Sequence, residues 1–559
     1  MGKTCGGTPF CPRRTALVFA FALDETGNPV SIRHRIEICH MSRLKNFSRN
    51  LATSYLQLSV NVMYSLVSVP LILHWLPRAE FGMWAVLVQL MAYISLVDLG
   101  INQAIARFLV DHKDRRSEGE YGALIKTSAL VSVAQGLIIL IGVTLGSPLL
   151  ATLMNIQKEY PEYQATFISL MRIQGVIAAF TFCMNPLQIM LNAHQRMDII
   201  SRQSIYNLTL SLGLLVLFLI RGCGIYSFVY AGAITAVITP AQLFWHCWRL
   251  GFVPRRDEWG NTSWPQFRQV FNYGKDLFFM NLGAQLITAS QIIIVTRALG
   301  LEAAAAWSVG TKIYTLVKQI LFQPYSAAIA GLSEMAARNE TERLRLRFKN
   351  LVVVTASLGV FTGIAFALCN SLFVAVWTGG KIVWSPLNDV LLAVWLFGSA
   401  LQCTHCNFVA ITKQIGGMRY LYFVEGCCFV GLAQNVGYRW GVPGIIACSI
   451  TCTFLFSYPY GLRRSRQFFH VSFFDLAVEW VRPSLKLAGV LVPVALIIWL
   501  ATSSLPAIWR LVIHGFAVGV VGGIFFLRLG LPLEVVREAG LRLPRPAARI
   551  LGLLVPCGI

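Results

Sequence analysis

Apolar residues in this chain gather into long runs, separated by short polar and basic segments. A helix that crosses a bilayer needs roughly 20 apolar residues in a row, because lipid offers no partner to unpaired backbone groups. The pattern therefore predicts an all-α polytopic membrane protein of about 14 transmembrane helices. We expect these helices at residues 51–76, 81–106, 124–146, 165–191, 204–220, 225–247, 276–298, 303–333, 350–376, 385–411, 419–437, 441–461, 486–504 and 509–530.

Composition supports a membrane protein over a nucleic-acid-binding one. Of the 559 residues, 56% are hydrophobic and 13% are charged, and the net charge is +22. Such a positive charge on a soluble chain would indicate nucleic-acid binding, but here the cations lie between the apolar runs. We therefore expect membrane lipids as partners and no nucleic acid.

Lys and Arg are distributed unevenly between alternate connections. One set of connections holds clusters such as Lys113, Arg115 and Arg116, whereas the other set holds only isolated cations. The isolated cations are Arg78, Lys158, Arg221, Lys381, Arg439 and Arg510. By the positive-inside rule the rich set is cytoplasmic, which places both termini in the cytoplasm.

The runs divide the chain into two lobes and several connecting segments. Residues 1–50 are expected to form a cytoplasmic extension, and Met41 is a more usual translation start than Met1. The remaining segments are 51–247 (N-lobe, helices 1–6), 248–275 (cytoplasmic linker), 276–461 (C-lobe, helices 7–12), 462–485 (cytoplasmic connection), 486–530 (helices 13–14) and 531–559 (cytoplasmic tail).

A stripe of polar residues recurs in helices 1 and 7 at spacings of four and three, which places each stripe on one helical face. Both helices start in the cytoplasm, so the two six-helix bundles are predicted to be related by a parallel pseudo-two-fold axis. The alternative is that the stripes only make interhelical hydrogen bonds. The stripes are Gln57, Asn61, Tyr64 and Ser68 in helix 1, and Asn281, Gln285 and Thr288 in helix 7.

Three cations lie within predicted helices, far from the basic connections: Arg172, Lys312 and Lys318. A charge at bilayer depth is costly unless it is paired or hydrated, so each indicates a polar interior. A cationic cavity suits an anionic passenger such as a phosphate. The alternative is a structural ion pair, for which Asp98, Asp389 and Glu425 are available partners.

Glu425 is the first candidate for coupling transport to a proton gradient. It lies about six residues into the predicted helix 11, where burial would favour its neutral, protonated form.

The chain lacks the sequence signatures of an enzyme. It has no G-x-x-x-x-G-K-[ST], no G-x-S-x-G and no H-E-x-x-H. Cys403 and Cys406 form a C-x-x-C without a second ligand pair at zinc spacing. We therefore predict no catalytic residues, no bound metal and no cofactor.

Several segments resemble the Wzx-type polysaccharide and O-antigen flippases, a branch of the multidrug/oligosaccharidyl-lipid/polysaccharide (MOP) flippase superfamily. The likeness is clearest between residues 50 and 107 and looser up to about residue 530. The segments that carry it are Val69–Leu73, Glu80–Trp84, Leu96–Ile101 and Arg107, followed by Asn192–Arg196 and Gln323–Pro324.

The resemblance implies two bundles around a central cavity that opens alternately to either side. The inner mouth would carry Asp98, Gly100 and Arg107. The cavity would be lined from helices 1, 2, 7 and 8, and the candidate cavity residues are Gln57, Asn61, Tyr64, Gln89, Arg172, Asn281, Gln285, Lys312 and Lys318.

The resemblance further implies a multi-pass protein of the bacterial inner membrane that flips an undecaprenyl-diphosphate-linked oligosaccharide for O-antigen, capsule or exopolysaccharide synthesis. A polysaccharide polymerase and a chain-length regulator would be its partners. Two alternatives stay open: a small-molecule cation antiporter of the same superfamily, and a membrane polysaccharide polymerase or ligase.

Overall fold

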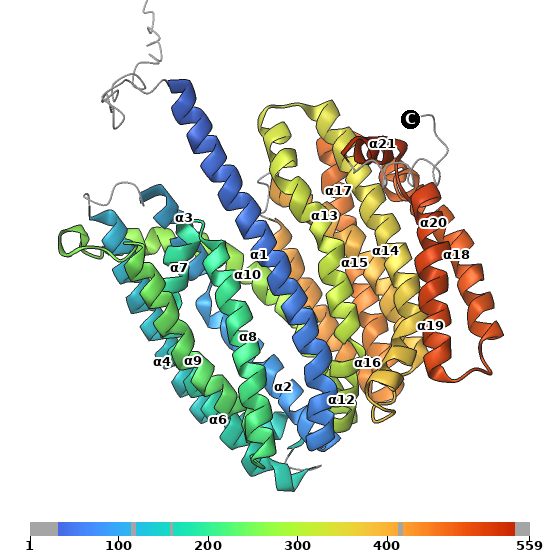
Figure 1. Cartoon of the computed structure of the whole chain (residues 1–559), viewed down its shortest axis with the longest axis horizontal. Coiled ribbons are helices and arrows are strands. Elements are labelled where there is room, and N and C mark those ends of the chain that lie inside the picture. Colours follow the sequence, from blue (N-terminus) through green and yellow to red (C-terminus); the bar gives the residue numbers. More distant parts are fainter. Residues whose placement is uncertain (1–31, 113–118, 157–159, 412–416, 543–559) are drawn as a thin grey trace, which may run out of the picture.

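The structure is a computed structural model that describes residues 32–112, 119–156, 160–411 and 417–542. All regular structure in these residues is helical, and the helices stand side by side in one bundle (Figure 1). The predicted all-α polytopic fold is therefore confirmed. The predicted extension lies outside the described residues up to residue 31, whereas residues 32–50 begin the first helix.

The N-terminal half of the bundle contains eight described α-helices and one short 3-10 turn. Several helices are broken, because Leu99, Gly100 and Gln195 adopt positive φ values between elements. The elements are α1 (Ile32–Trp75), α2 (Arg78–Ile94), the turn Ser95–Asp98, α3 (Ile101–His112), α4 (Glu120–Leu153), α6 (Pro161–Cys183), α7 (Asn185–Ala193), α8 (Met197–Ile220) and α9 (Tyr226–Arg249).

The second half repeats this pattern of packed helices. In the N-lobe α1 packs on α8 and α4 on α6, and in the C-lobe α10 packs on α16 and α14 on α15. The first and fifth crossings of each lobe therefore pack together, as do the third and fourth, so the six crossings of one lobe repeat in the other. The elements are α10 (Trp264–Thr288), α11 (Ser290–Leu299), α12 (Leu301–Gly310), α13 (Lys312–Ala337), α14 (Thr341–Trp377), α15 (Pro386–Ile411), α16 (Met418–Leu455) and α17 (Ser457–Phe469).

Twelve stretches of the described chain are long and apolar enough to cross a membrane. One of them, Met418–Phe469, makes two crossings, because the Ser457 hydroxyl donates to Glu425 Oε1 at 3.2 Å. In a straight helix those residues would be ~48 Å apart. The chain reverses at Gly441, where φ is 63°. Together with the crossing formed by the pair α12–α13, this gives fourteen crossings in the described residues, in agreement with the prediction.

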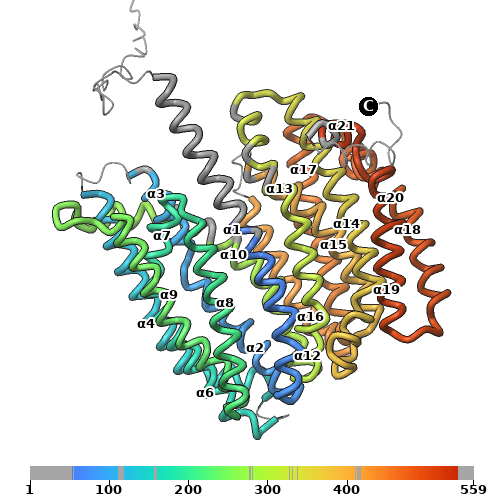
Figure 2. Tube along the Cα trace, viewed as in Figure 1, coloured from blue at the N-terminus to red at the C-terminus, as the bar shows by residue number. Residues whose placement is uncertain are grey.

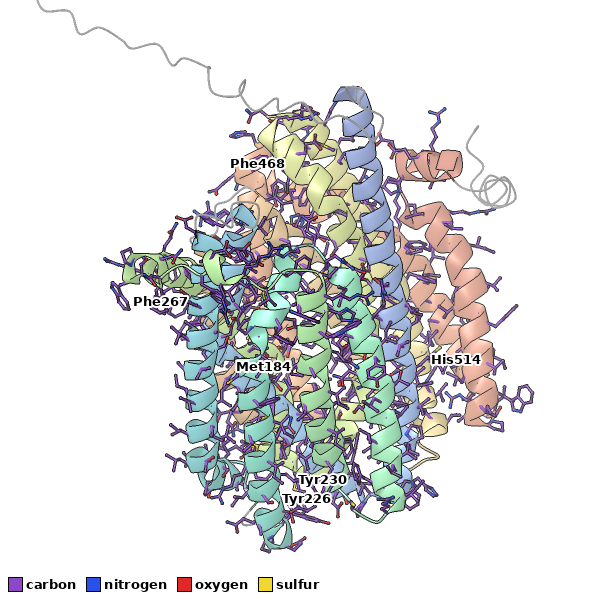
Figure 3. All side chains as sticks on the ribbon, turned by 60° about the vertical axis from the view of Figure 1, so that its left-hand side comes forward. Met184, Tyr226, Tyr230, Phe267, Phe468 and His514 are labelled. Atoms are coloured by element: carbon purple, nitrogen blue, oxygen red, sulfur yellow. The ribbon has the colours of Figure 1, made fainter. Side chains whose placement is uncertain are left out.

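The last two of these fourteen crossings follow the lobes, and a short helix closes the described chain. Fully buried His514 holds this unit to the C-lobe (Figure 3), since its Nδ1 donates to the Leu368 carbonyl at 3.0 Å and its Nε2 lies 2.8 Å from the Thr502 hydroxyl. The elements are α18 (Arg482–Ala501), α19 (Ala507–Ala517), α20 (Gly523–Phe525) with flanking π-helical turns, and α21 (Leu533–Arg542), where Glu538 pairs with Arg347 of α14 at 2.6 Å.

The two ends of the bundle differ in charge and in packing. We call the end with the Lys- and Arg-rich connections the basic end and the other the far end. At the far end one hydrophobic core includes residues of both lobes, such as Leu73, Leu87 and Trp307. Toward the basic end the cores are separate, one around Tyr121 in the N-lobe and one around Phe348 in the C-lobe. The lobes thus converge at the far end and diverge toward the basic end (Figure 2).

Candidate functional site

A cavity of about 570 Å³ lies between the two lobes. Its walls come from α1, α2, α6, α8 and α9 on one side and from the α10–α13 segment on the other. Its polar lining consists of Asn61, Tyr64, Ser65, Ser68, Gln89, Gln174, Ser211, Thr288, Ser308, Thr311, Lys312, Thr315 and Gln319.

Four of the predicted cavity residues, Asn61, Tyr64, Gln89 and Lys312, line this cavity. Gln57 belongs to the same stripe but lies outside the lining, because its Nε2 donates to the Ser204 hydroxyl of α8 at 2.9 Å. Gln57 therefore joins α1 to α8, as expected if the stripes make interhelical hydrogen bonds.

A second pocket of about 310 Å³ adjoins the cavity on its basic side and shares Thr288 with it. Predicted residues Asn281 and Gln285 line this pocket together with Asp98 and Gly100 of the predicted inner-mouth motif. The two polar stripes thus face the same inter-lobe space at different depths.

The Asp98–Gly100 motif forms the break between α2 and α3. Gly100 has a φ of 70°, which favours glycine, and Asp98 Oδ1 accepts the backbone N–H of Asn102 at 3.3 Å. The backbone of α10 lies against this break, since a Cβ added to Gly274 would be 2.8 Å from the Leu99 carbonyl oxygen. Arg107, the third predicted inner-mouth residue, is exposed on α3 and lines neither pocket.

Lys318 and Arg172 do not line the cavity. Lys318 points into the C-lobe, where its Nζ is 5.2 Å from the Trp395 ring centroid, a cation–π geometry. Arg172 is exposed on α6 and donates to the Ser147 hydroxyl of α4 at 3.3 Å.

The acidic residues proposed as ion-pair partners have other contacts. Asp98 caps α3, Asp389 accepts hydrogen bonds from side chains of its own lobe, and Glu425 accepts one from Ser457. Among the described residues, no ion pair joins any of them to Lys312, Lys318 or Arg172. Glu425 is buried between α16 and α17 and lines neither inter-lobe pocket.

A buried hydrogen-bond network holds the break between α12 and α13 that precedes Lys312. The Asn370 amide donates to the Gly310 carbonyl at 3.0 Å and to Asp389 Oδ1 at 2.7 Å. The Trp384 indole also donates to Asp389 Oδ1, at 2.7 Å. Because Gly310 ends α12 and Lys312 begins α13, the network fixes the direction in which Lys312 enters the cavity.

Replacing Asn370 with leucine should lower the apparent melting temperature in detergent. The change leaves the buried Gly310 carbonyl without its side-chain donor and removes one donor to Asp389, and each such loss costs about 1–3 kcal/mol. Asn435→Leu is the matched control, because Asn435 is exposed and its amide only donates to a carbonyl of its own helix. Equal melting temperatures for the two variants would contradict this role.

Sequence reasoning missed the aromatic wall of the cavity. Trp84 of α2 stacks on Phe228 of α9 with ring centroids 4.3 Å apart, and Trp307 lines the opposite wall. Gln319 was also missed, although Lys312 and Gln319 are seven residues apart and so share one helical face. That spacing was the available signal that Lys312 shares a polar face with Gln319 and that Lys318 lies on another face.

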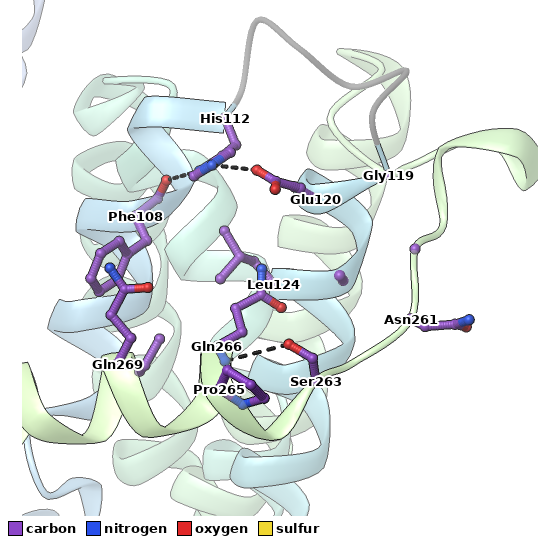
Figure 4. A pocket seen from close by; sticks show the side chains of 13 residues that line it. Phe108, His112, Gly119, Glu120, Leu124, Asn261, Ser263, Pro265, Gln266 and Gln269 are labelled. Atoms are coloured by element: carbon purple, nitrogen blue, oxygen red, sulfur yellow. Dashed lines mark hydrogen bonds and ion pairs between the residues drawn. The ribbon is translucent and has the colours of Figure 1, made fainter.

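Two further hollows lie away from the inter-lobe cavity. One, of about 490 Å³, connects α3, α4 and the start of α10 at the basic end (Figure 4), where His112 Nε2 is 2.5 Å from Glu120 and its Nδ1 donates to the Phe108 carbonyl. The other, about 520 Å³, is an apolar groove between α14, α15 and α18. Neither contains a residue of the predicted cavity.

At the far end, the backbones of the two lobes are in direct contact. A Cβ added to Gly82 of α2 would be 1.9 Å from the Leu301 carbonyl oxygen of α12, so only glycine allows this approach. Gly82 belongs to the Glu80–Trp84 segment that carried the family resemblance. The segment therefore has a physical role in closing the far end of the cavity.

Comparisons with known proteins agree with this architecture. A model of the polysaccharide biosynthesis protein family matches residues 48–335. No curated protein matches the chain. Two solved structures show the same fold. The lipid II flippase MurJ in an inward closed conformation has a TM-score of 0.62 and 13% identity, and the match covers 85% of this chain and 98% of that chain. An inward-facing MATE multidrug transporter of the MOP superfamily has a TM-score of 0.60 and 13% identity, and the match covers 76% of this chain and 99% of that chain.

A third solved structure, a MOP superfamily transporter from Pyrococcus furiosus whose binding pocket has reverse polarity, has a TM-score of 0.52, 16% identity and coverage of 76% of this chain and 96% of that chain. The match to the family model covers more than half of the sequence. The chain therefore belongs to the polysaccharide biosynthesis protein family, and it has the fold of the MOP superfamily transporters.

Proposed function

We propose that this protein is a flippase that moves a lipid-linked oligosaccharide, carried on undecaprenyl diphosphate, across the bacterial inner membrane. The observation that carries the proposal is the chemistry of the inter-lobe cavity. Its lining combines hydroxyl and amide groups with aromatic rings, and Lys312 is its one charged side chain among the residues that the structure describes.

Each part of this lining suits a part of the passenger. Amides and hydroxyls exchange hydrogen bonds with sugar hydroxyls, and the stacked pair of Trp84 and Phe228 offers an apolar face to a sugar ring. The ammonium of Lys312 supplies a charge-assisted hydrogen bond to a phosphate. The polyprenyl tail would stay in the bilayer, which surrounds the bundle.

The packing of the lobes supports alternating access. We place the basic end and both termini in the cytoplasm, following the positive-inside rule. With that orientation the far end, where the two lobes share a core, would be the side closed toward the outside. Residues 51–247 and 276–461 are the proposed moving units, connected by 248–275. A polymerase and a chain-length regulator would act on the exported unit in O-antigen, capsule or exopolysaccharide synthesis.

A cation antiporter is the second candidate, because the fold is also that of MATE transporters. An antiporter of cations is expected to have carboxylates in its cavity. No carboxylate belongs to the described lining of the central cavity, and Asp98 in the adjoining pocket caps α3. A polymerase or ligase is supported less, since the described connections at the far end are short.

Deleting the gene in its host tests the proposal. We expect complete lipid-linked repeat units to accumulate on the cytoplasmic face while surface polysaccharide is lost, and the intact gene to restore export. Normal surface polysaccharide without a trapped intermediate, in a strain without a redundant transporter, would contradict a flippase. Sensitivity of that strain to cationic drugs would then favour the antiporter.

A further inference from the structure

Two backbone carbonyl groups in the far-end half of α1 lack their normal helical donors. In an α-helix the carbonyl of residue i accepts from the N–H of residue i+4. Four residues after Leu66 stands Pro70, and four residues after Leu73 stands Pro77. Proline has no N–H, so both carbonyls stay open to a donor from outside the helix.

The C-lobe supplies a donor to each of these carbonyls. The Trp377 indole N–H donates to the Leu66 carbonyl oxygen at 2.8 Å. The Lys381 ammonium donates to the Leu73 carbonyl oxygen at 2.5 Å. Both donors come from one short segment, since Trp377 ends α14 and Lys381 follows in the next turn.

Local structure presents the two donors to α1. The Trp377 ring stacks on Phe373 of its own helix, with centroids 5.1 Å apart. Gly379 and Gly380 have φ values of 60° and 76°, which reverse the chain after α14 and bring Lys381 alongside α1. Lys381 is also one of the few cations at the far end.

We propose that these contacts form an inter-lobe latch at the far end, in which prolines of the N-lobe expose carbonyls that Trp377 and Lys381 of the C-lobe engage only while the far end is closed. Opening exchanges each contact for a hydrogen bond to water and breaks no hydrogen bond within α1. The latch therefore holds the closed state with modest strength and releases it reversibly, as a transporter requires.

The latch is tested by measuring the distance between the lobes in the purified, full-length protein without substrate. Spin labels would be attached at Arg221 and Trp440, which are exposed at the far end of the N-lobe and the C-lobe. Labels on unnatural amino acids avoid the 14 native cysteines. Because no passenger is present, the result is independent of whether the protein is a flippase.

Trp377→Phe removes the indole N–H and keeps the stacked ring, whereas Lys381→Met removes the ammonium and keeps the stem. Each is expected to raise the ratio of far-end-open to closed molecules roughly fivefold, the factor for one net hydrogen bond. Trp499→Phe is the matched control, because Trp499 lines the apolar groove between α14, α15 and α18 and lines neither inter-lobe pocket. An unchanged distance distribution in both latch variants would overturn the proposal.

A double-mutant cycle separates the latch from simple packing. Pro70→Ala gives the Leu66 carbonyl a helical donor, so it should open the far end by itself. In the Pro70→Ala background, Trp377→Phe should then have less than half of its original effect. If Trp377→Phe has the same effect in both backgrounds, Trp377 acts through packing and the role of the proline is wrong.

Discussion

Replacing Lys312 with methionine is expected to lower flipping ~10–100-fold, the factor for one hydrogen bond to a charged group, while the protein stays folded. Lys312 is half-buried in the cavity lining and is the one cation there among the described residues. Methionine keeps most of the length of the side chain and removes the ammonium, with its charge and its hydrogen-bond donors. The measurement is export of lipid-linked oligosaccharide in a deletion strain that carries the variant, normalised to protein in the membrane.

Lys318→Met is the matched control for this experiment. It removes an ammonium that lies over Trp395 inside the C-lobe, six residues further along the same helix. Lys318 is half-buried, and a cation–π contact contributes about 0.5–2 kcal/mol, so this variant should fold and export nearly normally. The opposite result, with Lys318→Met inactive and Lys312→Met active, would transfer the phosphate-binding role to Lys318 and to another conformation of the cavity.

Replacing Gly82 with alanine is expected to prevent full closure of the far end. The new Cβ would lie 1.9 Å from the Leu301 carbonyl oxygen, and backbone atoms cannot move aside as a flexible side chain can. Overpacking of this kind costs about 1–3 kcal/mol. The ratio of closed to open molecules measured with the labels at Arg221 and Trp440 should therefore fall roughly 5–150-fold, and export should fall with it.

Gly142→Ala provides the control for the change from glycine to alanine in a membrane helix. An added Cβ at Gly142 of α4 meets no atom within 4 Å. Alanine also favours helix over glycine by about 1 kcal/mol, so this variant should be as stable as the parent or more stable. Equal behaviour of Gly82→Ala and Gly142→Ala would show that α2 and α12 have no need of this close contact.

The sequence by itself determined the number and order of the membrane crossings, and which polar residues of helix 1 share one face. Long apolar runs have no soluble alternative, so their number and order follow from composition along the chain. The separation of helices 11 and 12 also followed from sequence, since Gly441 and Pro443 interrupt the apolar run where the chain reverses. Likewise, the spacing of Asn61 and Tyr64 places both on one face, and both line the cavity.

Only the tertiary structure decided what each polar group meets. Periodicity gives the angle between Lys312 and Lys318 around α13, but the neighbouring helices decide which side is the cavity and which side holds Trp395. In the same way, Pro70 shows in the sequence that the Leu66 carbonyl lacks a helical donor. The donor, Trp377, lies 311 residues away in the other lobe, and only the packing of the two lobes brings it within hydrogen-bond distance.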